Sequence, residues 1–251
     1  MKPSMLQQSK QVVKKGFIIF IWIMVWQCVH SFVGKDILVP SPYATLNKLL
    51  ELMEEVRFYQ EILLTFYRVG MGVALSVGIG CLSALGACFF RWFREILAPL
   101  IILLKSTPVI AIIILALLWF SKDTVPIFVC FLMCYPVMYT NVLKGLQCVD
   151  QELLEMVKVF NVKRSQVIRA VYMPQVKPYI EAGLGMVVGL SWKVVIAAEV
   201  LAVPRYSMGY NLLSAKSYLE TETLFAWVVV IVVLSGLCEY GVMRLLERRK
   251  K

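Results

Sequence analysis

Residues 150–178 read DQELLEMVKVFNVKRSQVIRAVYMPQVKP. This polar segment is unusual here because 60% of the 251 residues are hydrophobic and only 17% are charged. The mean hydropathy of the chain is +0.76, which is far too apolar for a soluble domain of this size. We therefore interpret residues 150–178 as part of a loop that lies outside a lipid bilayer, between two membrane-spanning segments.

The rest of the chain contains apolar runs long enough to cross a bilayer of about 30 Å. Backbone groups in lipid must be hydrogen-bonded within their own segment, so each run is expected to be helical. The predicted spans are 16–33, 62–86, 96–120, 125–144, 178–201 and 223–243. We expect an all-α polytopic membrane protein with about six transmembrane helices. Residues 1–251 should form a single transmembrane domain, with its main polar loop at 145–177.

The start of the chain and its lysine and arginine residues predict an orientation. The run 16–33 lacks a small-x-small cleavage site, so it is expected to remain as a span and not to be removed as a signal peptide. Of the 26 Lys and Arg residues, 17 fall on the side of both termini and the 145–177 loop, six on the other side and three within spans. The positive-inside rule therefore places both termini and this loop in the cytoplasm.

The net charge of +10 has a simple explanation in this topology. Basic residues concentrated on the cytoplasmic side face anionic lipid headgroups. The charge therefore predicts contact with a lipid membrane and no nucleic-acid partner.

The long loop has a helical pattern of its own. Residues 151–160 (QELLEMVKVF) predict a short amphipathic helix, with apolar and charged side chains on opposite faces. Asn161 is expected to end this helix, because asparagine tolerates the left-handed conformation. A second helix is expected at 164–172, with Pro174 and Pro178 interrupting the chain after it. A short helix held between two spans is a rigid lever that a cytoplasmic motor protein can move.

Outside the loop, local patterns predict helix ends, contacts and bends. Ser41 is expected to cap an amphipathic helix over 41–57, with Pro42 in its first turn. Small residues at four-residue steps predict close helix packing. They form one row of Gly72, Ser76, Gly80, Ala84 and Cys88 and a second row of Gly70, Ala74 and Gly78. The prolines within the third and fourth spans, Pro99, Pro108, Pro126 and Pro136, indicate bends that either line a cavity or are static kinks.

Several ionisable residues fall inside the predicted spans, where a charge costs on the order of 3 kcal/mol and needs a partner or water. Arg68 and Glu199 are expected at similar depth near the outer ends of their spans, and we predict that they pair. Lys105 and Lys193 lie deeper. Either they meet an anionic substrate, or they snorkel to the surface or pair with Glu239 or a backbone carbonyl.

The placement of the seven cysteines and the lack of a nucleotide-binding motif limit the chemistry expected of the chain. Cys130 and Cys134 share a helix face, but no further ligand is near them in sequence, so we interpret them as packing residues and not as a metal site. A disulfide framework is not expected. The sequence has no Walker-type phosphate loop, so we expect no ATP site, no cofactor and no enzymatic activity in this chain itself.

The long loop also matches a known pattern. Glu155-Met156-Val157, three residues, Asn161, nine residues and then Val171-Tyr172-Met173-Pro174 resembles the EAA loop of bacterial ABC-importer permeases. That pattern is Glu-Ala-Ala, three residues, Gly, nine residues and Ile-x-Leu-Pro. Glu155 and Pro174 are present at the right separation, whereas the inner positions differ, with Asn161 in place of glycine.

The order of other features resembles the nitrate/sulfonate/taurine group of these type I permeases over most of the chain. The matching stretches are Pro40-Ser41-Pro42, Thr65-Phe66-Tyr67-Arg68-Val69-Gly70, Pro99, Thr107-Pro108-Val109-Ile110-Ala111, Trp192, Ala198-Glu199 and Ser207-Met208-Gly209. The resemblance implies a type I ABC-importer permease fold in a bacterial inner membrane. It implies three protein partners: a second copy of the chain that completes a homodimeric pore, a dimer of cytoplasmic ATPase subunits, and an extracytoplasmic substrate-binding protein.

The resemblance also implies roles for particular residues. The expected ATPase-coupling residues are Glu152, Glu155, Met156, Val157, Asn161 and Pro174. The charges and prolines within the spans, rather than the resemblance, give the candidate residues of the translocation path: Lys105, Pro108, Lys193, Glu199 and Arg68. The solute is expected to be a small organic or inorganic anion or a vitamin precursor, selected mainly by the binding protein.

Two other classes of function remain open at this point. The chain could be a secondary transporter or channel that uses its intramembrane charges as ion sites. It could also be a membrane scaffold or assembly protein without transport activity. Co-purification of an ATPase would separate an ABC permease from both.

Overall fold

The computed structural model describes residues 5–248, and all the regular structure within them is helical. Four basic residues that entered the orientation prediction, Lys2, Arg249, Lys250 and Lys251, lie outside this range. The chain divides into two compact units, each described here by itself. Unit 1 comprises Met1–Tyr59 and Asn211–Val230, and unit 2 comprises Gln60–Tyr210 and Ile231–Lys251.

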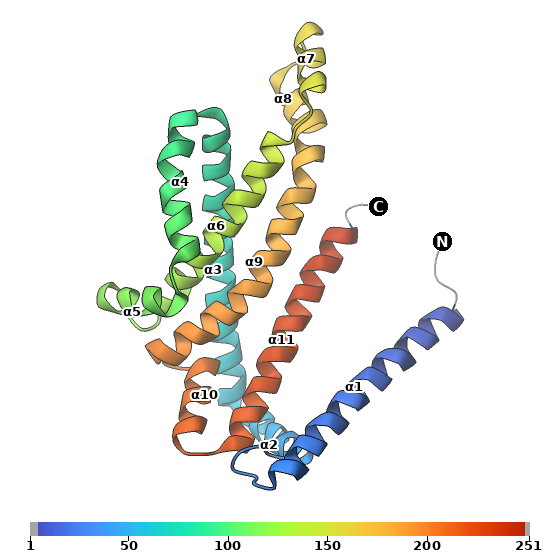
Figure 1. Cartoon of the computed structure of the whole chain (residues 1–251), viewed down its shortest axis with the longest axis vertical. Coiled ribbons are helices and arrows are strands. Elements are labelled where there is room, and N and C mark those ends of the chain that lie inside the picture. Colours follow the sequence, from blue (N-terminus) through green and yellow to red (C-terminus); the bar gives the residue numbers. More distant parts are fainter. Residues whose placement is uncertain (1–4, 249–251) are drawn as a thin grey trace. The chain divides into compact units, whose positions relative to one another are not determined.

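The helices follow one another with short connections (Figure 1). They are α1 (Met5–Val33), α2 (Pro42–Glu54), α3 (Val56–Phe89), α4 (Arg91–Ser106), α5 (Val109–Trp119), α6 (Val125–Gln147), α7 (Gln151–Val159), α8 (Arg164–Val167), the π-helical turn η1 (Ile168–Tyr172), α9 (Met173–Ala202), α10 (Met208–Ser217) and α11 (Thr221–Arg248). Within residues 5–248, five helical segments are long and apolar enough to cross a membrane, and the pair α4–α5 makes a sixth if it counts as one span. The predicted all-α class with about six spans is confirmed.

The third predicted span, 96–120, is not one helix. The chain turns by 107° between α4 and α5. Pro108 has no N–H to continue the helix, and it forces the preceding Thr107 into an extended conformation with ψ of 129°. The bend that the prolines of this span indicated is confirmed at Pro108.

The prediction of an interruption at Pro174 and Pro178 was wrong. The helical path is unbroken from Ser165 to Ala202 and contains an apolar stretch long enough to cross a membrane. The wider turn η1 lies immediately before Pro174, where the N–H of Met173 bonds to the carbonyl of Ile168. A π-helical turn accommodates a residue that cannot take part in the ordinary α-helical bonding, so the helix continues through the proline.

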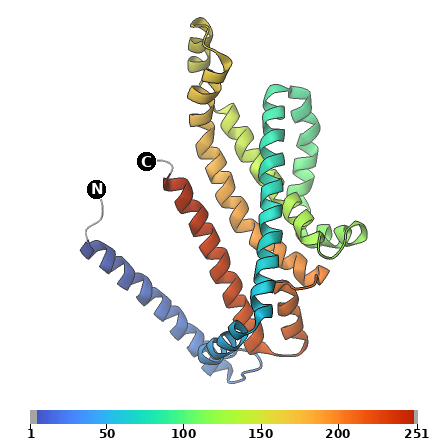
Figure 2. The same ribbon diagram turned by 180° about the vertical axis from the view of Figure 1, so that it is seen from behind.

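Unit 2 is organised around α6 and α9, which pack along each other (Figures 1 and 2). Helices α4 and α5 also pack on α6, and α5 reaches α9. On the α3 side, Gly72 allows the closest approach: a Cβ there would lie 2.5 Å from the Sγ atom of Cys130. Ser76 donates a hydrogen bond to the carbonyl of Phe131, and Gly80 faces Met138. The first predicted row of small residues is therefore a helix contact.

The second predicted row behaves differently. Gly70, Ala74 and Gly78 are exposed on α3, and a Cβ at either glycine would have no neighbouring atom within 4 Å. The two rows lie on the same helix, yet only the first is in contact with α6.

In unit 1, α2 begins as the sequence predicts. The Ser41 hydroxyl accepts a hydrogen bond from the N–H of Ala44 at 3.1 Å, and Pro42 opens the first turn. The indole N–H of Trp26 on α1 donates to the carbonyl of Pro40 at 3.1 Å. The lysine of this helix is also paired, because Lys48 donates a hydrogen bond to Glu51. This bond raises the pKa of Lys48 above its ordinary value.

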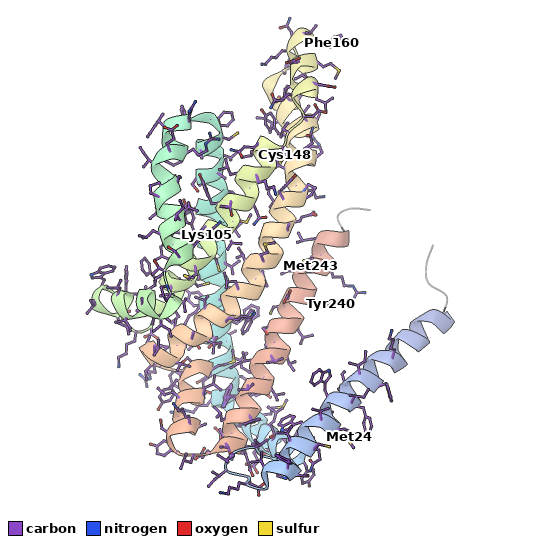
Figure 3. The ribbon with its side chains drawn as sticks, in the orientation of Figure 1. Met24, Lys105, Cys148, Phe160, Tyr240 and Met243 are labelled. Atoms are coloured by element: carbon purple, nitrogen blue, oxygen red, sulfur yellow. The ribbon has the colours of Figure 1, made fainter. Side chains whose placement is uncertain are left out.

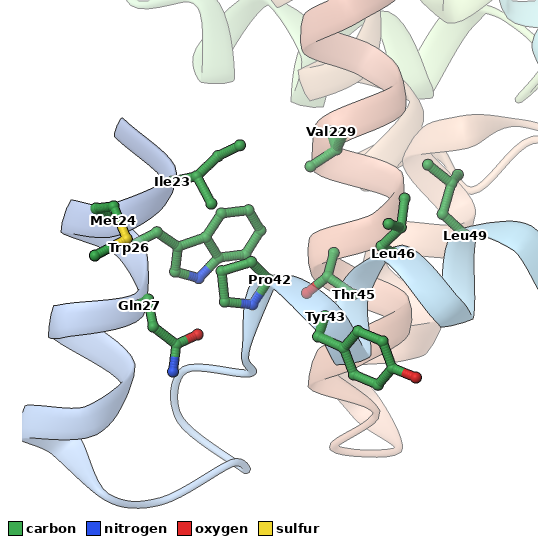
Figure 4. A pocket seen from close by; sticks show the side chains of 10 residues that line it. All are labelled: Ile23, Met24, Trp26, Gln27, Pro42, Tyr43, Thr45, Leu46, Leu49 and Val229. Carbon is green, nitrogen blue, oxygen red and sulfur yellow. The ribbon is translucent and has the colours of Figure 1, made fainter. Parts of the chain in front are cut away.

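Helices α1, α2 and the start of α11 enclose an apolar cavity of about 560 Å³ in unit 1 (Figure 4). Trp26 and Ile23 of α1 face Leu46 of α2 and Val229 of α11 across it. The portion of α1 that could span a membrane, Gly16–Val33, has no buried residue. Its side chains are large and apolar, as expected of a helix surrounded by lipid or by another protein.

The contact at Gly72 gives a direct test of this packing. We expect Gly72→Ala to lower the free energy of unfolding by about 1–3 kcal/mol, because the new methyl group overlaps Cys130. Gly78→Ala is the matched control and should cause no loss. Thermal unfolding of the purified variants in one detergent measures the difference, and equal stability of the two variants would contradict the packing described here.

Candidate coupling loop and buried charge cluster

Local hydrogen bonds fix both ends of α7. At its start, the Asp150 side chain accepts from the N–H of Glu152 at 2.9 Å. At its end, the N–H of Asn161 bonds to the carbonyl of Lys158, and the N–H of Val162 bonds to the carbonyl of Val157. This pair of bonds is a Schellman motif, which requires a left-handed residue at the position of Asn161. Asn161 has φ of 49°, so the predicted left-handed helix end is confirmed.

The surface of α7 is more apolar than a free loop would be. No residue of α7 is buried. The side chains of Val159, Phe160 and Met156 are 78%, 73% and 50% exposed, beside the exposed carboxylates of Glu152 and Glu155. Figure 3 shows Phe160 at the free tip of this region. Exposed apolar clusters rimmed by charges are typical of surfaces that contact proteins or membranes, so α7 is a candidate for such a surface.

The loop is joined rigidly to two membrane helices. The N–H of Asp150 bonds to the side-chain oxygen of Gln175 near the start of α9, at 3.0 Å. Near the end of α6, a Cβ at Gly145 would lie 2.8 Å from Tyr179 of α9. Pro174 is exposed where α8 and η1 lead into α9. The predicted coupling residues are thus gathered in one projection from α6 and α9, seen beyond their ends in Figures 1 and 2.

The opposite end of α9 holds a buried charge cluster. The Arg68 guanidinium donates to Glu199 at 2.9 Å and to Asp123 at 2.9 Å. The Thr65 hydroxyl contacts both Glu199 carboxylate oxygens, at 2.9 and 3.0 Å, and the N–H of Gly209 donates to Glu199 at 3.1 Å. We call Thr65, Arg68, Asp123 and Glu199 the Arg68 cluster. The predicted pairing of Arg68 with Glu199 is confirmed.

The Arg68 cluster also shapes the connection between α9 and α10. Arg68 donates to the carbonyls of Arg205 and Tyr206, both at 3.2 Å. Val203 and Tyr206 have φ of 52°, which is unfavourable for side chains of this kind and persists only where surrounding contacts enforce it. Gly209 is required by its neighbours, since a Cβ there would lie 2.8 Å from the N atom of Val200.

The candidate path residues fall into two groups. Arg68 and Glu199 are packed in the interior, with 4% and 0% of their surfaces exposed. Lys105, Pro108 and Lys193 are exposed. The Nζ atom of Lys105 lies 3.4 Å from the Thr140 hydroxyl, and Figure 3 shows Lys105 on α4. The structure therefore does not bring these five residues into one site.

Glu239 lies against α9 one helical turn before Lys193. The carboxylate of Glu239 on α11 faces Gly189 of α9, and a Cβ at Gly189 would lie 3.6 Å from one of its oxygens. Gly189 is one helical turn from Lys193. The alternative prediction that Lys193 pairs with Glu239 stays a prediction.

Sequence reasoning missed Asp123 as a member of the cluster. It lies in the turn between α5 and α6, 55 residues from Arg68, and no local pattern distinguishes it from other exposed aspartates. Thr65 and Gly209 belong to the stretches that carried the family resemblance, but no contact was predicted for them. Both donate hydrogen bonds to the Glu199 carboxylate, and only the tertiary structure shows this.

These features define a class of protein. It is a polytopic helical membrane protein that projects a short, exposed, partly apolar helix from two of its spans. Residues 76–251 match the family described as binding-protein-dependent transport system inner membrane component. The chain belongs to this family, and it is a multi-pass inner-membrane permease subunit of an ABC importer, whose ATPase is a separate subunit.

Related sequences cover almost the whole chain. A Bacillus subtilis (strain 168) protein provisionally described as an aliphatic sulfonates transport permease is 27% identical over 94% of this chain and 86% of its own length. The taurine transport system permease protein of Escherichia coli (strain K12) is 26% identical over 96% and 90%. A solved bacterial ABC transporter involved in alginate import has the same fold, with a TM-score of 0.71, 12% identity and 98% of each chain covered.

The Arg68 cluster predicts strong energetic coupling between its charges. Arg68→Met or Glu199→Met alone should lower the free energy of unfolding by about 3–5 kcal/mol, because each leaves a buried charge without its partner. The double variant should lose clearly less than the sum of the two losses. Unfolding of all variants in one detergent measures this, with Lys122→Met as the control, and additive losses would contradict the coupling.

Asn161 gives a second prediction, on the loop. Asn161→Gly should keep the end of α7, since glycine adopts a positive φ freely. Asn161→Val should destabilise it by about 1–2 kcal/mol, the usual cost of the left-handed conformation for other L-residues. Hydrogen exchange of the amides in residues 151–162 reports the change, and identical exchange in both variants would show that the Schellman motif does not hold this helix.

Proposed function

We propose that this permease admits a small sulfonate, such as taurine or an alkanesulfonate, as a homodimer of single transmembrane domains spanning residues 1–251. The names of the related permeases, which refer to aliphatic sulfonates and to taurine, support this class of solute. The observation that carries the proposal is the exposed α7 projection on a permease fold. It supplies the surface through which an ATPase can drive transport by a chain that has no ATP site of its own.

The coupling step rests on the 145–177 loop. In this proposal a dimer of cytoplasmic ATPase subunits contacts Glu152, Glu155, Met156 and Val157 on α7, with Asn161 and Pro174 setting the shape of the loop. The apolar side chains at the tip are buried on binding, and the carboxylates meet basic groups at the rim. Because α7 follows α6 after three residues, and the N–H of Asp150 at its start bonds to Gln175 of α9, a movement of α7 is passed to both helices.

The exposed charges within the spans support a second copy of the chain. Lys105 and Lys193 are exposed on membrane helices, and an exposed charge in lipid costs on the order of 3 kcal/mol or more. They are better accommodated in a water-filled path between two copies, which also gives an anion two cationic side chains per subunit. Pro108 places the break between α4 and α5 beside this path. Arg68 and Glu199 form part of its framework.

The orientation follows the distribution of basic residues. Both termini and the α7 projection lie in the cytoplasm, and α2, the α5–α6 turn and the α9–α10 loop face the opposite side. An extracytoplasmic binding protein delivers the solute there. Closure of the ATPase dimer around ATP opens the path outward, and hydrolysis resets it.

A charge reversal on α7 tests the proposed function. Glu155→Arg should abolish co-purification of the ATPase and lower ATP-dependent uptake of taurine or an alkanesulfonate into proteoliposomes by about tenfold or more, because it places a repulsive charge in the interface. Glu222→Arg, on the opposite side of the membrane, is the control and should keep both. Normal uptake with Glu155→Arg, or steady uptake by wild-type protein without any ATPase, would disprove the assignment.

A further inference from the structure

The two carboxylates of the Arg68 cluster differ greatly in their surroundings. Glu199 is fully buried and receives bonds from Arg68, Thr65 and the backbone of Gly209. Asp123 is 64% exposed on the α5–α6 turn, and its Oδ1 atom lies 2.9 Å from Arg68. One guanidinium therefore joins a carboxylate that is locked in the interior to one that stands at the surface.

Arg68 also fastens two segments that are far apart in sequence. Its Nη1 atom binds Glu199 and the carbonyl of Tyr206, and its Nη2 atom binds Asp123 and the carbonyl of Arg205. These bonds use all four N–H groups of the two terminal nitrogens. The α5–α6 turn and the α9–α10 loop are consequently held by the same group.

Besides the bond from Arg68, the α5–α6 turn is held by Phe120 and Phe128, whose rings pack across it with centroids 4.4 Å apart. Thr124 and Val125 donate their N–H groups to the carbonyl of Ser121, so those bonds are internal to the turn. The turn follows α5, the short helix that begins at the Pro108 break and packs on α6 and α9. A force that moves the turn therefore moves the C-terminal end of α5, whose other end borders the proposed path.

We propose that Asp123 is a positioning residue for transport, which acts through Arg68. It holds the α5–α6 turn and the α9–α10 loop together, so that the two segments close the outer end of the path. It releases Arg68 when the path opens outward, while the bond between Arg68 and Glu199 persists. This inference rests on the proposed orientation and importer function.

The unequal burial decides which half of the cluster releases. Separating Glu199 from Arg68 would leave a fully buried carboxylate without its counter-charge, which is strongly unfavourable. Separating Asp123 exposes a carboxylate that water already reaches, and ion pairs with such an exposed member are weak. Arg68 binds the carbonyls of Arg205 and the left-handed Tyr206, so loosening Arg68 on the Asp123 side also loosens the α9–α10 loop.

The test compares Asp123→Asn with Asp123→Glu and Lys122→Gln in the full transporter, reconstituted with its ATPase in lipid nanodiscs without binding protein. Asp123→Asn keeps the shape but removes the charge. It should raise basal ATP hydrolysis about fivefold, because the outward-open form is reached more easily. Asp123→Glu should return hydrolysis to near the wild-type rate, and Lys122→Gln should leave it unchanged.

Hydrogen exchange of the same samples provides a readout that does not depend on hydrolysis. In Asp123→Asn, the amides of residues 121–124 and 203–209 should both exchange faster. Faster exchange in 121–124 alone would overturn the proposal, as would unchanged basal hydrolysis or a fall in hydrolysis matching the loss of assembled complex. A wild-type chain that assembles with no ATPase would refute the importer function instead. Hydrogen exchange in the chain alone would still test the link between residues 121–124 and 203–209.

Discussion

Backbone hydrogen bonding in an apolar environment is the constraint on which this structure depends. Each span satisfies its own N–H and carbonyl groups by being helical. Where a helix ends, other groups must form hydrogen bonds with the backbone N–H and carbonyl groups that the helix leaves unpaired. At the α9–α10 loop this is done by Arg68, which donates to the carbonyls of Arg205 and Tyr206 while it neutralises Glu199. A charged residue that would be costly alone thus stabilises an irregular segment near the end of a span.

The same constraint explains how the helices meet. Because lipid is as apolar as the side chains, the hydrophobic effect gives little attraction between spans, and close packing must provide it. The row that includes Gly72 and Gly80 lets α3 approach α6, and Gly145 lets α6 approach Tyr179 of α9. The tightly packed α6–α9 pair then carries α7. An importer needs this stiffness, since a motion imposed on a soluble loop must reach the spans without being absorbed.

The loop itself shows how function is placed on local structure. Asp150 and Asn161 secure the two ends of α7 through bonds that involve only nearby residues. This local fixation allows α7 to keep its shape while its apolar side chains remain exposed, as the proposed ATPase contact requires. The departure from the family pattern at Asn161 preserves the physical requirement, because asparagine adopts the left-handed conformation that glycine would supply.

The sequence alone determined the features that rest on periodicity, composition and neighbouring residues: the spans, the Ser41 cap, the α7 helix with its left-handed end at Asn161, and the resemblance of the loop. It also brought Arg68 and Glu199 together, because two opposite charges at similar depth in a membrane have few other partners. Only the tertiary structure decided that the chain turns by 107° at Pro108 and runs on through Pro174. It alone added Asp123 to the Arg68 cluster. Proline marks a possible bend in the sequence, but its size depends on how the following turn forms, and the contact of Asp123 joins residues 55 apart in sequence that no local pattern connects.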